Sequence, residues 1–143
     1  MEEGRIRGRL ELRVNARAAS LGRIRRLLAR FLVEHDLHER QRQDALIVVN
    51  ELAANAIEHA STDEDQVEIA VRLETETLLI RVLDPARTAE RPSRRGPDMW
   101  RESGRGMLIV DELASWNDEL VGGRRAVTAR LTLPHEAAKR SRS

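Results

Sequence analysis

A carboxylate and a carboxamide stand four residues apart in the stretch from Asp44 to Ala60, DALIVVNELAANAIEHA. Apolar residues recur there every three or four positions, which predicts an amphipathic helix with one buried face. Glu51 and Asn55 lie one turn apart beside that face. A Glu can act as a general base and an Asn oxygen can bind a hard cation, although an ordinary solvated helix face would show the same spacing.

The composition narrows the classes of protein and site. A chain of 143 residues suits one domain, and its net charge of +1 argues against a dedicated nucleic-acid binder. Cysteine is absent, which excludes disulfides, a thiol nucleophile and a cysteine zinc site. The four histidines form no H-x-x-x-H pair, and no G-x-x-x-x-G-K motif is present. Neither a zinc enzyme nor a P-loop enzyme is indicated.

The chain is expected to form a single domain over 1–143, with a core at about 10–133 and a flexible basic tail at 134–143. Its first residues, MEEGRIRGRL, contain no apolar run of the kind that a signal peptide or a membrane span requires. We therefore expect a cytoplasmic protein that does not contact the membrane.

The pattern of alternating and helical periodicities predicts the order β, α, α, β, β, loop, α, β, β. Such an order favours an α+β two-layer sandwich, with a mixed, mainly antiparallel sheet and helices packed on one face. It does not fit a Rossmann-like fold, because strands and helices do not alternate regularly. The expected elements are a strand at 6–14, a helix at 21–37 capped by Ser20, a helix at 39–59, strands at 67–73 and 78–83, a loop at 85–103, a helix that follows Gly104 and ends near Trp116, and strands at 118–121 and 126–133.

Two further features carry chemistry in a fixed order after the Glu51 helix. Asp84 stands at the end of an expected strand, where a side chain can contact a ligand. After the long loop, Gly104 and Gly106 open an apolar helix. Free backbone N–H groups at a helix N-terminus favour an anion such as phosphate, and glycine lets the backbone approach it closely. The ordered set indicates a nucleotide site more strongly than any one motif does.

In this order, from about Leu10 to Leu133, the chain resembles the ATP-binding domain of the GHKL superfamily. NELAANAIEHA resembles the N box and SGRGMLIVDELAS resembles the second glycine box. Within the superfamily, the closest likeness is to the anti-sigma factor serine/threonine protein kinases and related small ATP-binding regulators.

The resemblance implies a role for each motif residue. Glu51 would be the general base, Asn55 the Mg²⁺ ligand, and Asp84 the acceptor of a hydrogen bond from the adenine amino group. The phosphates of ATP would lie against the start of the last helix. The residues implied there are Gly104, Arg105, Gly106 and Met107. His59 occupies a position that is commonly His in these regulators, where packing at the helix end explains it.

The chain departs from the family pattern after Asp84. The first glycine box normally has the form D-x-G-x-G, whereas here Pro85, Ala86 and Arg87 follow the aspartate and both glycines are missing. Ala86 is expected to lie against the adenine. A Thr on the last strand often supports the adenine aspartate, and Thr128 is expected to take that role because it lies two residues beyond the matching position and on the same strand face.

The function that the resemblance implies is that of an ATP- and Mg²⁺-dependent kinase. It would phosphorylate an anti-sigma factor antagonist of the STAS type and hold a sigma factor inactive, without direct nucleic-acid contact, and it would form a homodimer. One alternative is a module of the same fold that sequesters a sigma factor or another regulator with weak or no ATP turnover. A sensor-kinase catalytic domain is disfavoured because no phosphoacceptor helix precedes the domain. An α+β domain that binds no nucleotide is the remaining alternative.

Overall fold

The computed structural model describes residues 5–87 and 106–133. They form a five-stranded sheet in the order β1-β2-β3-β5-β4, in which every strand pairing is antiparallel. The predicted order of helices and strands and the α+β sandwich are thereby confirmed, with an antiparallel rather than a mixed sheet. The loop expected at 85–103 lies outside the described residues from position 88 on. The elements are β1 (Ile6–Asn15), α1 (Ser20–Glu34), α2 (Glu39–Glu58), β2 (Gln66–Glu74), β3 (Thr77–Arg87), α4 (Gly106–Leu113), β4 (Ser115–Val121) and β5 (Arg124–Thr132).

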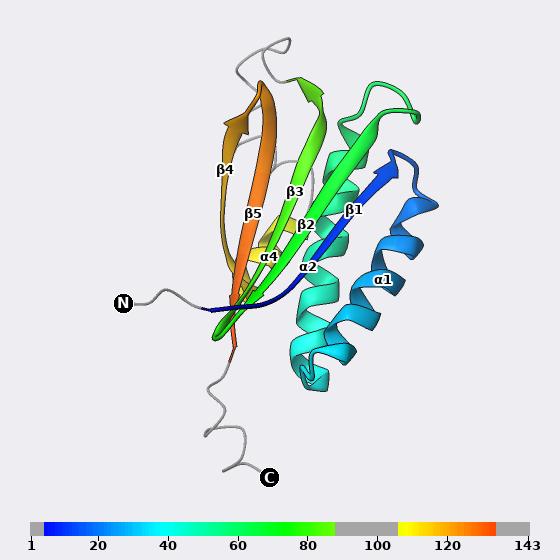
Figure 1. Ribbon diagram of the computed structural model, residues 1–143. Helices are drawn as coiled ribbons and strands as arrows, with labels where there is room; N and C mark the ends of the chain where they lie inside the picture. The colour runs from blue at the N-terminus through cyan, green and yellow to red at the C-terminus, as the bar shows by residue number, and fades with distance from the viewer. Residues whose placement is uncertain (1–4, 88–105, 134–143) are drawn as a thin grey trace.

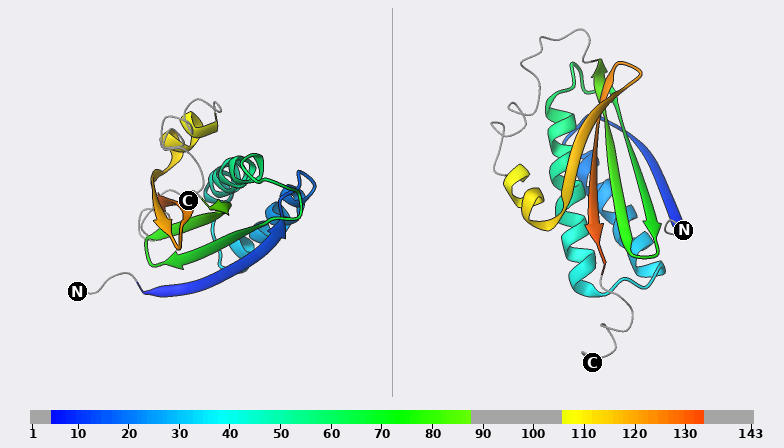
Figure 2. Two further views of the ribbon diagram at one scale, coloured as in Figure 1. Left: turned by 90° about the horizontal axis from the view of Figure 1, so that it is seen from above. Right: turned by 90° about the vertical axis from the view of Figure 1, so that its left-hand side faces the viewer.

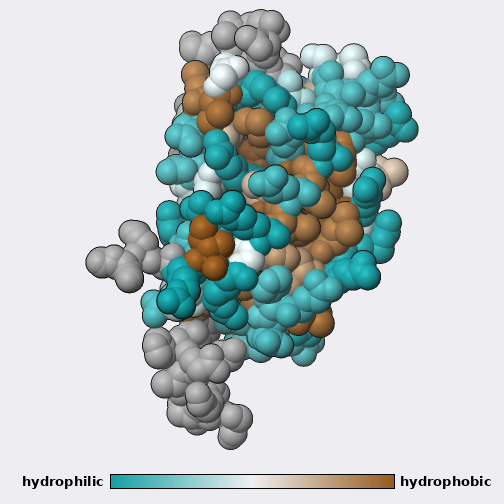
Figure 3. Space-filling view, viewed as in Figure 1, coloured by the Kyte–Doolittle hydropathy of each residue, from teal (hydrophilic) through white to brown (hydrophobic). Residues whose placement is uncertain are grey.

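The three helices of the described residues, α1, α2 and α4, cover the same face of the sheet, as Figures 1 and 2 show. Side chains alternate along each strand, so every second residue points toward the helices. On β3 these are Leu78, Ile80 and Val82, each at most 2% exposed. They pack with buried residues of α1 and α2 into one hydrophobic core. We call the face that the helices cover the helix face of the sheet and the opposite face the open face. Figure 3 shows apolar surface over the middle of the open face, with hydrophilic side chains around it.

Several details differ from the elements expected from the sequence. Helix α1 ends at Glu34, before the expected end at 37. Ser20 is the first residue of α1, the N-cap is Ala19, and no side chain caps the helix, so the predicted Ser20 cap is wrong. β3 continues to Arg87, beyond the strand expected at 78–83. The helix expected to end near Trp116 stops at Leu113. Trp116 belongs to β4, where it pairs with β5 and packs against the core, because the 115–121 segment also alternates.

The central helix α2 has well-defined ends. Its N-cap is His38, which forms a reciprocal capping box with Gln41: each side chain accepts a hydrogen bond from the other residue's backbone N–H. Its C-cap is His59, whose backbone N–H donates to the Asn55 and Ala56 carbonyls. A helix fixed at both ends holds the side chains along it in fixed positions. No helix among the described residues is long and apolar enough to cross a membrane.

Two glycines offer a matched test of how the sheet edge packs against α1. A Cβ on Gly8 of β1 would overlap the His35 imidazole, coming within 2.9 Å of its Cδ2. His35 cannot move freely, because its Nδ1 lies 2.9 Å from the Phe31 carbonyl and its ring packs on the Phe31 ring. Gly22, within α1, has only flexible arginine ends nearby.

We expect Gly8→Ala to destabilise the fold by about 1–3 kcal/mol through overpacking. By contrast, Gly22→Ala should stabilise it by about 0.5–1 kcal/mol, because alanine loses less backbone entropy in a helix. Chemical denaturation followed by circular dichroism measures both free energies of unfolding. A Gly8→Ala variant at least as stable as the wild type would contradict the packing of His35 on β1.

Candidate functional site

Glu51 and Asn55 lie on α2 as the sequence predicts, and neither side chain has a hydrogen bond or ion pair with another described residue. Asn55 is only 8% exposed, yet its carboxamide makes no hydrogen bond with the described residues. The half-buried Glu51 carboxylate has no ion pair within the same ranges. Other polar side chains of α2 do have partners: the Asn50 oxygen accepts a bond from Arg25, at 2.7 Å. The Asn55 carboxamide thus lies in a largely buried residue but is not committed to another described side chain, which leaves it available to a ligand.

Asp84 is brought to the C-terminal end of α2. It is 5% exposed and faces the helices, where its Oδ2 lies 3.6 Å from Nδ1 of the His59 ring. His59 is itself 7% exposed. Because His59 follows Asn55 by four residues at the helix end, the contact places Asp84 near the same end of α2 as Asn55. Glu51, Asn55 and Asp84 therefore belong to one region of the molecule.

The backbone around Asp84 departs from regular strand pairing. The last regular pair between β3 and β5 is Leu83 with Ala126, and the next is Arg87 with Arg124. Asp84, Pro85 and Ala86 therefore face a single residue of β5, which is the arrangement of a β-bulge. The Asp84 carbonyl accepts a hydrogen bond of 3.0 Å from Nε of Arg124. A bulge redirects a side chain, and this one lies directly at the predicted ligand-binding aspartate.

The start of α4 contributes backbone rather than side chains. Helix α4 begins at Gly106 and packs against α2. The Met107 side chain is 1% exposed and belongs to the hydrophobic core, so only its backbone is available to a ligand. Gly104 and Arg105, the other two residues implied in phosphate binding, lie outside the described residues.

Thr128 does not lie where the resemblance implied. Its neighbours Val127 and Ala129 are buried against the helices, so Thr128 points to the open face, opposite Arg81. The Asp84 carboxyl faces α2, and the sheet separates the two side chains. Thr128 therefore does not support Asp84. Ala86, which is expected to lie against the adenine, belongs to β3, but the structure describes only its backbone.

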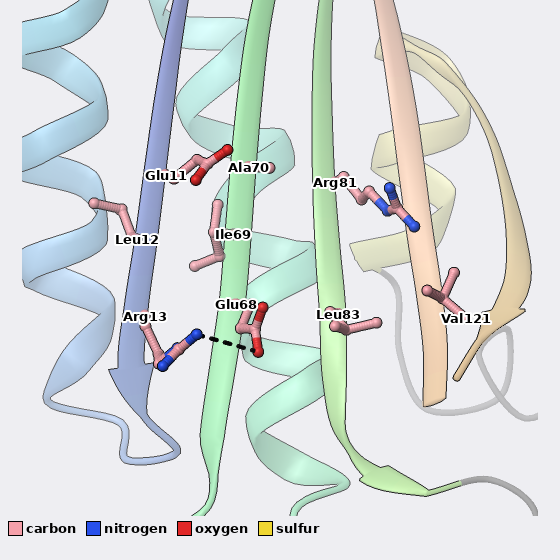
Figure 4. Close-up of a pocket in the computed structure, with 9 residues that line it drawn as sticks. All are labelled: Glu11, Leu12, Arg13, Glu68, Ile69, Ala70, Arg81, Leu83 and Val121. Carbon is pink, nitrogen blue, oxygen red and sulfur yellow. Dashed lines mark ion pairs between the residues drawn. The ribbon is translucent and has the colours of Figure 1, made fainter. Parts of the chain in front are cut away.

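A separate hollow of about 510 Å³ lies on the open face of the sheet (Figure 4), whereas α2, which carries Glu51 and Asn55, covers the other face. Its lining includes three residues that lie side by side on β1, β2 and β3: Glu11, Ala70 and Arg81. The small Ala70 side chain leaves space between the two charged side chains. No motif pointed to this surface. Within the described ranges, no group of three or more His, Asp or Glu side chains could hold a metal ion by itself.

Sequence reasoning gave no binding role to His59 and did not single out Arg124. A signal for His59 was present, because it continues the four-residue spacing of Glu51 and Asn55 on one helix face. Arg124 offered none, since an arginine after a Gly-Gly turn has no special spacing relative to Asp84. Its contact depends on the bulge in β3, which only the folded chain reveals.

Comparison with known proteins identifies the class. The family model described as a histidine kinase-like ATPase domain matches residues 14–131, which is most of the chain. The protein belongs to this family of ATPase domains, and the resemblance to GHKL-type ATP-binding domains is confirmed. The matched range includes both motif helices, the strands β2, β3 and β4, β5 up to residue 131, and only the last two residues of β1.

A solved structure shares the fold. A chain in the crystal structure of the SiaB-SiaC complex from Pseudomonas aeruginosa matches with a TM-score of 0.59 and 15% sequence identity. The match covers 91% of this chain and 92% of that one. No curated protein matches the sequence. At this identity the structural likeness concerns the fold alone.

Proposed function

We propose that the protein binds Mg·ATP between α2, the bulge of β3 and the start of α4, and transfers the γ-phosphoryl group to a hydroxyl of a partner protein. The observation that carries the proposal is the pair on α2. A buried carboxamide and a carboxylate, neither engaged by the described residues, lie one turn apart near a buried aspartate. Membership of an ATPase-domain family makes ATP the nucleotide to expect.

Each residue would have a distinct task. Asp84 would accept a hydrogen bond from the exocyclic amino group of adenine, which guanine lacks at that position. The Asn55 oxygen suits Mg²⁺, a hard cation that takes oxygen ligands and keeps contacts to phosphate oxygens. Bound Mg²⁺ would offset negative charge on the phosphates. The backbone N–H groups at the start of α4 would add donors there.

Glu51 would act on the nucleophile. Its carboxylate would accept the proton of a serine or threonine hydroxyl as the hydroxyl oxygen attacks the γ-phosphorus and the bond to the bridging oxygen of ADP breaks. Phosphoryl transfer of this kind depends mainly on positioning and electrostatics. A half-buried carboxylate without an ion pair in the described ranges is available to accept that proton.

The resemblance to anti-sigma factor kinases supports a specific pair of partners. The phosphoacceptor would be an anti-sigma factor antagonist of the STAS type, and a sigma factor would be the second partner. The structurally similar chain comes from a two-protein complex, SiaB-SiaC, which fits a protein as partner. The proposal further includes a cytoplasmic location and a homodimer.

A second candidate function is a module of the same fold that sequesters its partner without ATP turnover. The residues after Asp84 favour it, because Pro85, Ala86 and Arg87 replace the flexible glycine box. Pro85 restricts the backbone where close approach of adenine needs room. The two candidates differ in whether nucleotide binds and in whether the bound nucleotide turns over.

Titration with a fluorescent ATP analogue distinguishes them. We expect saturable binding that is tighter with Mg²⁺ than with EDTA. Thr128→Ala is the matched control, because Thr128 lies on the open face and its removal should leave the affinity unchanged. Absence of saturable binding at millimolar nucleotide would refute the kinase and leave the sequestering module.

A further inference from the structure

We propose that Arg124 is a positioning residue: its guanidinium holds the bulge of β3 from the open face and so fixes the Asp84 carboxyl on the helix face. This inference rests on the proposed function, because it concerns how the aspartate is presented to the nucleobase. Arg124 does not contact the proposed ligand. It acts through the backbone of Asp84, to which its Nε donates at 3.0 Å.

The bulge explains why a side chain is needed there. Beyond Leu83, β3 has no regular pair with either neighbour until Arg87, and Pro85 has no N–H to donate. The Asp84 carbonyl therefore lies outside the regular ladder. A buried carbonyl needs a hydrogen-bond donor, and the Arg124 guanidinium donates to this one.

The guanidinium is itself held in place by β2. Its Nη1 lies 3.4 Å from the Glu68 carboxylate and its Nη2 lies 3.5 Å from the Gln66 carbonyl. The Arg124 side chain is 24% exposed, which is far less than a free surface arginine. Three acceptors on two strands thus fix one planar group. The group joins β5 to β3 and β2 at the point where regular pairing ends.

Asp84 is consequently held from two directions. Arg124 fixes its carbonyl at the sheet, and His59 of α2 lies 3.6 Å from its carboxylate. With the backbone and the carboxylate both fixed, the carboxylate has a defined direction. A carboxylate with a defined direction can distinguish an amino group from a carbonyl on a base, which is the difference between adenine and guanine at this position. Arg124 would therefore determine base selectivity more than phosphate affinity.

The test compares four proteins: the wild type, Arg124→Ala, Asp84→Ala and Arg13→Ala. Arg13 is the matched control, because it also pairs with Glu68 on the open face, at 3.9 Å, and has no contact with Asp84. Affinities for ATP, GTP and inorganic tripolyphosphate are measured with Mg²⁺ by displacement of the fluorescent analogue. Arg124→Lys is added because it keeps the charge but replaces the planar guanidinium, with its three nitrogens, by a single ammonium nitrogen.

We expect Arg124→Ala to weaken ATP binding about ten-fold, the equivalent of one hydrogen bond to a charged group, and to reduce the preference for ATP over GTP. The affinity of Arg124→Ala for tripolyphosphate should equal that of the wild type, and Arg13→Ala should bind all three ligands as the wild type does. Arg124→Lys should have an ATP affinity between those of the wild type and Arg124→Ala. Loss of ATP and tripolyphosphate affinity in equal proportion would overturn the inference. The inference would also be overturned if Asp84→Ala bound ATP more weakly than the wild type while Arg124→Ala bound it with unchanged affinity and selectivity.

Backbone hydrogen exchange tests the same contact without nucleotide. The amides of Ala86 and Arg87 should exchange faster in Arg124→Ala than in the wild type and in Arg13→Ala, because the bulge opens more often. Unchanged exchange would overturn the inference. If the wild type shows no saturable ATP binding, or Asp84→Ala binds ATP as the wild type does, the proposed nucleotide site fails instead.

Discussion

Replacing Glu51 with glutamine is expected to reduce the phosphotransfer rate by about 10²- to 10⁴-fold, the usual contribution of a general base, while ATP affinity stays nearly constant. The carboxamide is almost the same size as the carboxylate but cannot accept the hydroxyl proton. Glu51 makes no ion pair with the described residues, so the substitution leaves no partner there without its charge. Single-turnover transfer from γ-labelled ATP to a purified STAS-type antagonist measures the rate.

The matched control for this variant is Glu58→Gln, an exposed glutamate on the same helix. It removes the same charge two turns away and should transfer phosphate at the wild-type rate. A Glu51→Gln protein that transfers phosphate as fast as the control would remove Glu51 from the mechanism. If Glu51→Gln loses ATP affinity as well as transfer rate, Glu51 contributes to nucleotide binding.

Asn55→Ala is expected to weaken Mg²⁺-dependent ATP binding by at least about ten-fold, with a small effect on binding in EDTA. The reason is that the variant removes the buried oxygen that suits the cation. The fold should tolerate the change, because the Asn55 carboxamide bonds to none of the described residues and leaves no partner unsatisfied. Titration of ATP with and without Mg²⁺ gives both affinities.

Asn50→Ala provides the comparison for Asn55→Ala. Asn50 is the same residue type on the same helix, but its oxygen bonds to Arg25 of α1. Its loss should affect stability slightly and leave Mg²⁺ dependence unchanged. If Glu51→Gln weakens Mg²⁺-dependent binding more than Asn55→Ala does, the two roles have been assigned in the wrong order.

Local periodicity was enough to predict most of the fold. The helix of Glu51 and Asn55 and the hairpin of β2 and β3 follow from spacing within one segment. The Gly122–Gly123 turn is of the same kind: both residues adopt positive φ, as a tight hairpin between β4 and β5 requires. Each of these predictions needed only neighbouring residues.

Predictions that depended on strand register were less successful. Thr128 was expected beside Asp84, but the face that a residue of β5 presents depends on its pairing with β3, which the sequence does not specify. The bulge after Leu83 and the Arg124 contact have the same origin, because they arise between strands far apart in sequence. For the same reason, the helix after Gly106 could not be separated from the strand that contains Trp116.

The common helix of Glu51, Asn55 and His59 has a mechanical consequence. At intervals of four residues, each lies about 6 Å along the axis from the next and on nearly the same side. A shift of α2 along its axis would therefore displace the proposed proton acceptor, the proposed cation ligand and the histidine that contacts Asp84 by the same amount. Because the three side chains move together with the helix, a partner protein that displaces α2 would move all three toward or away from a bound nucleotide at once.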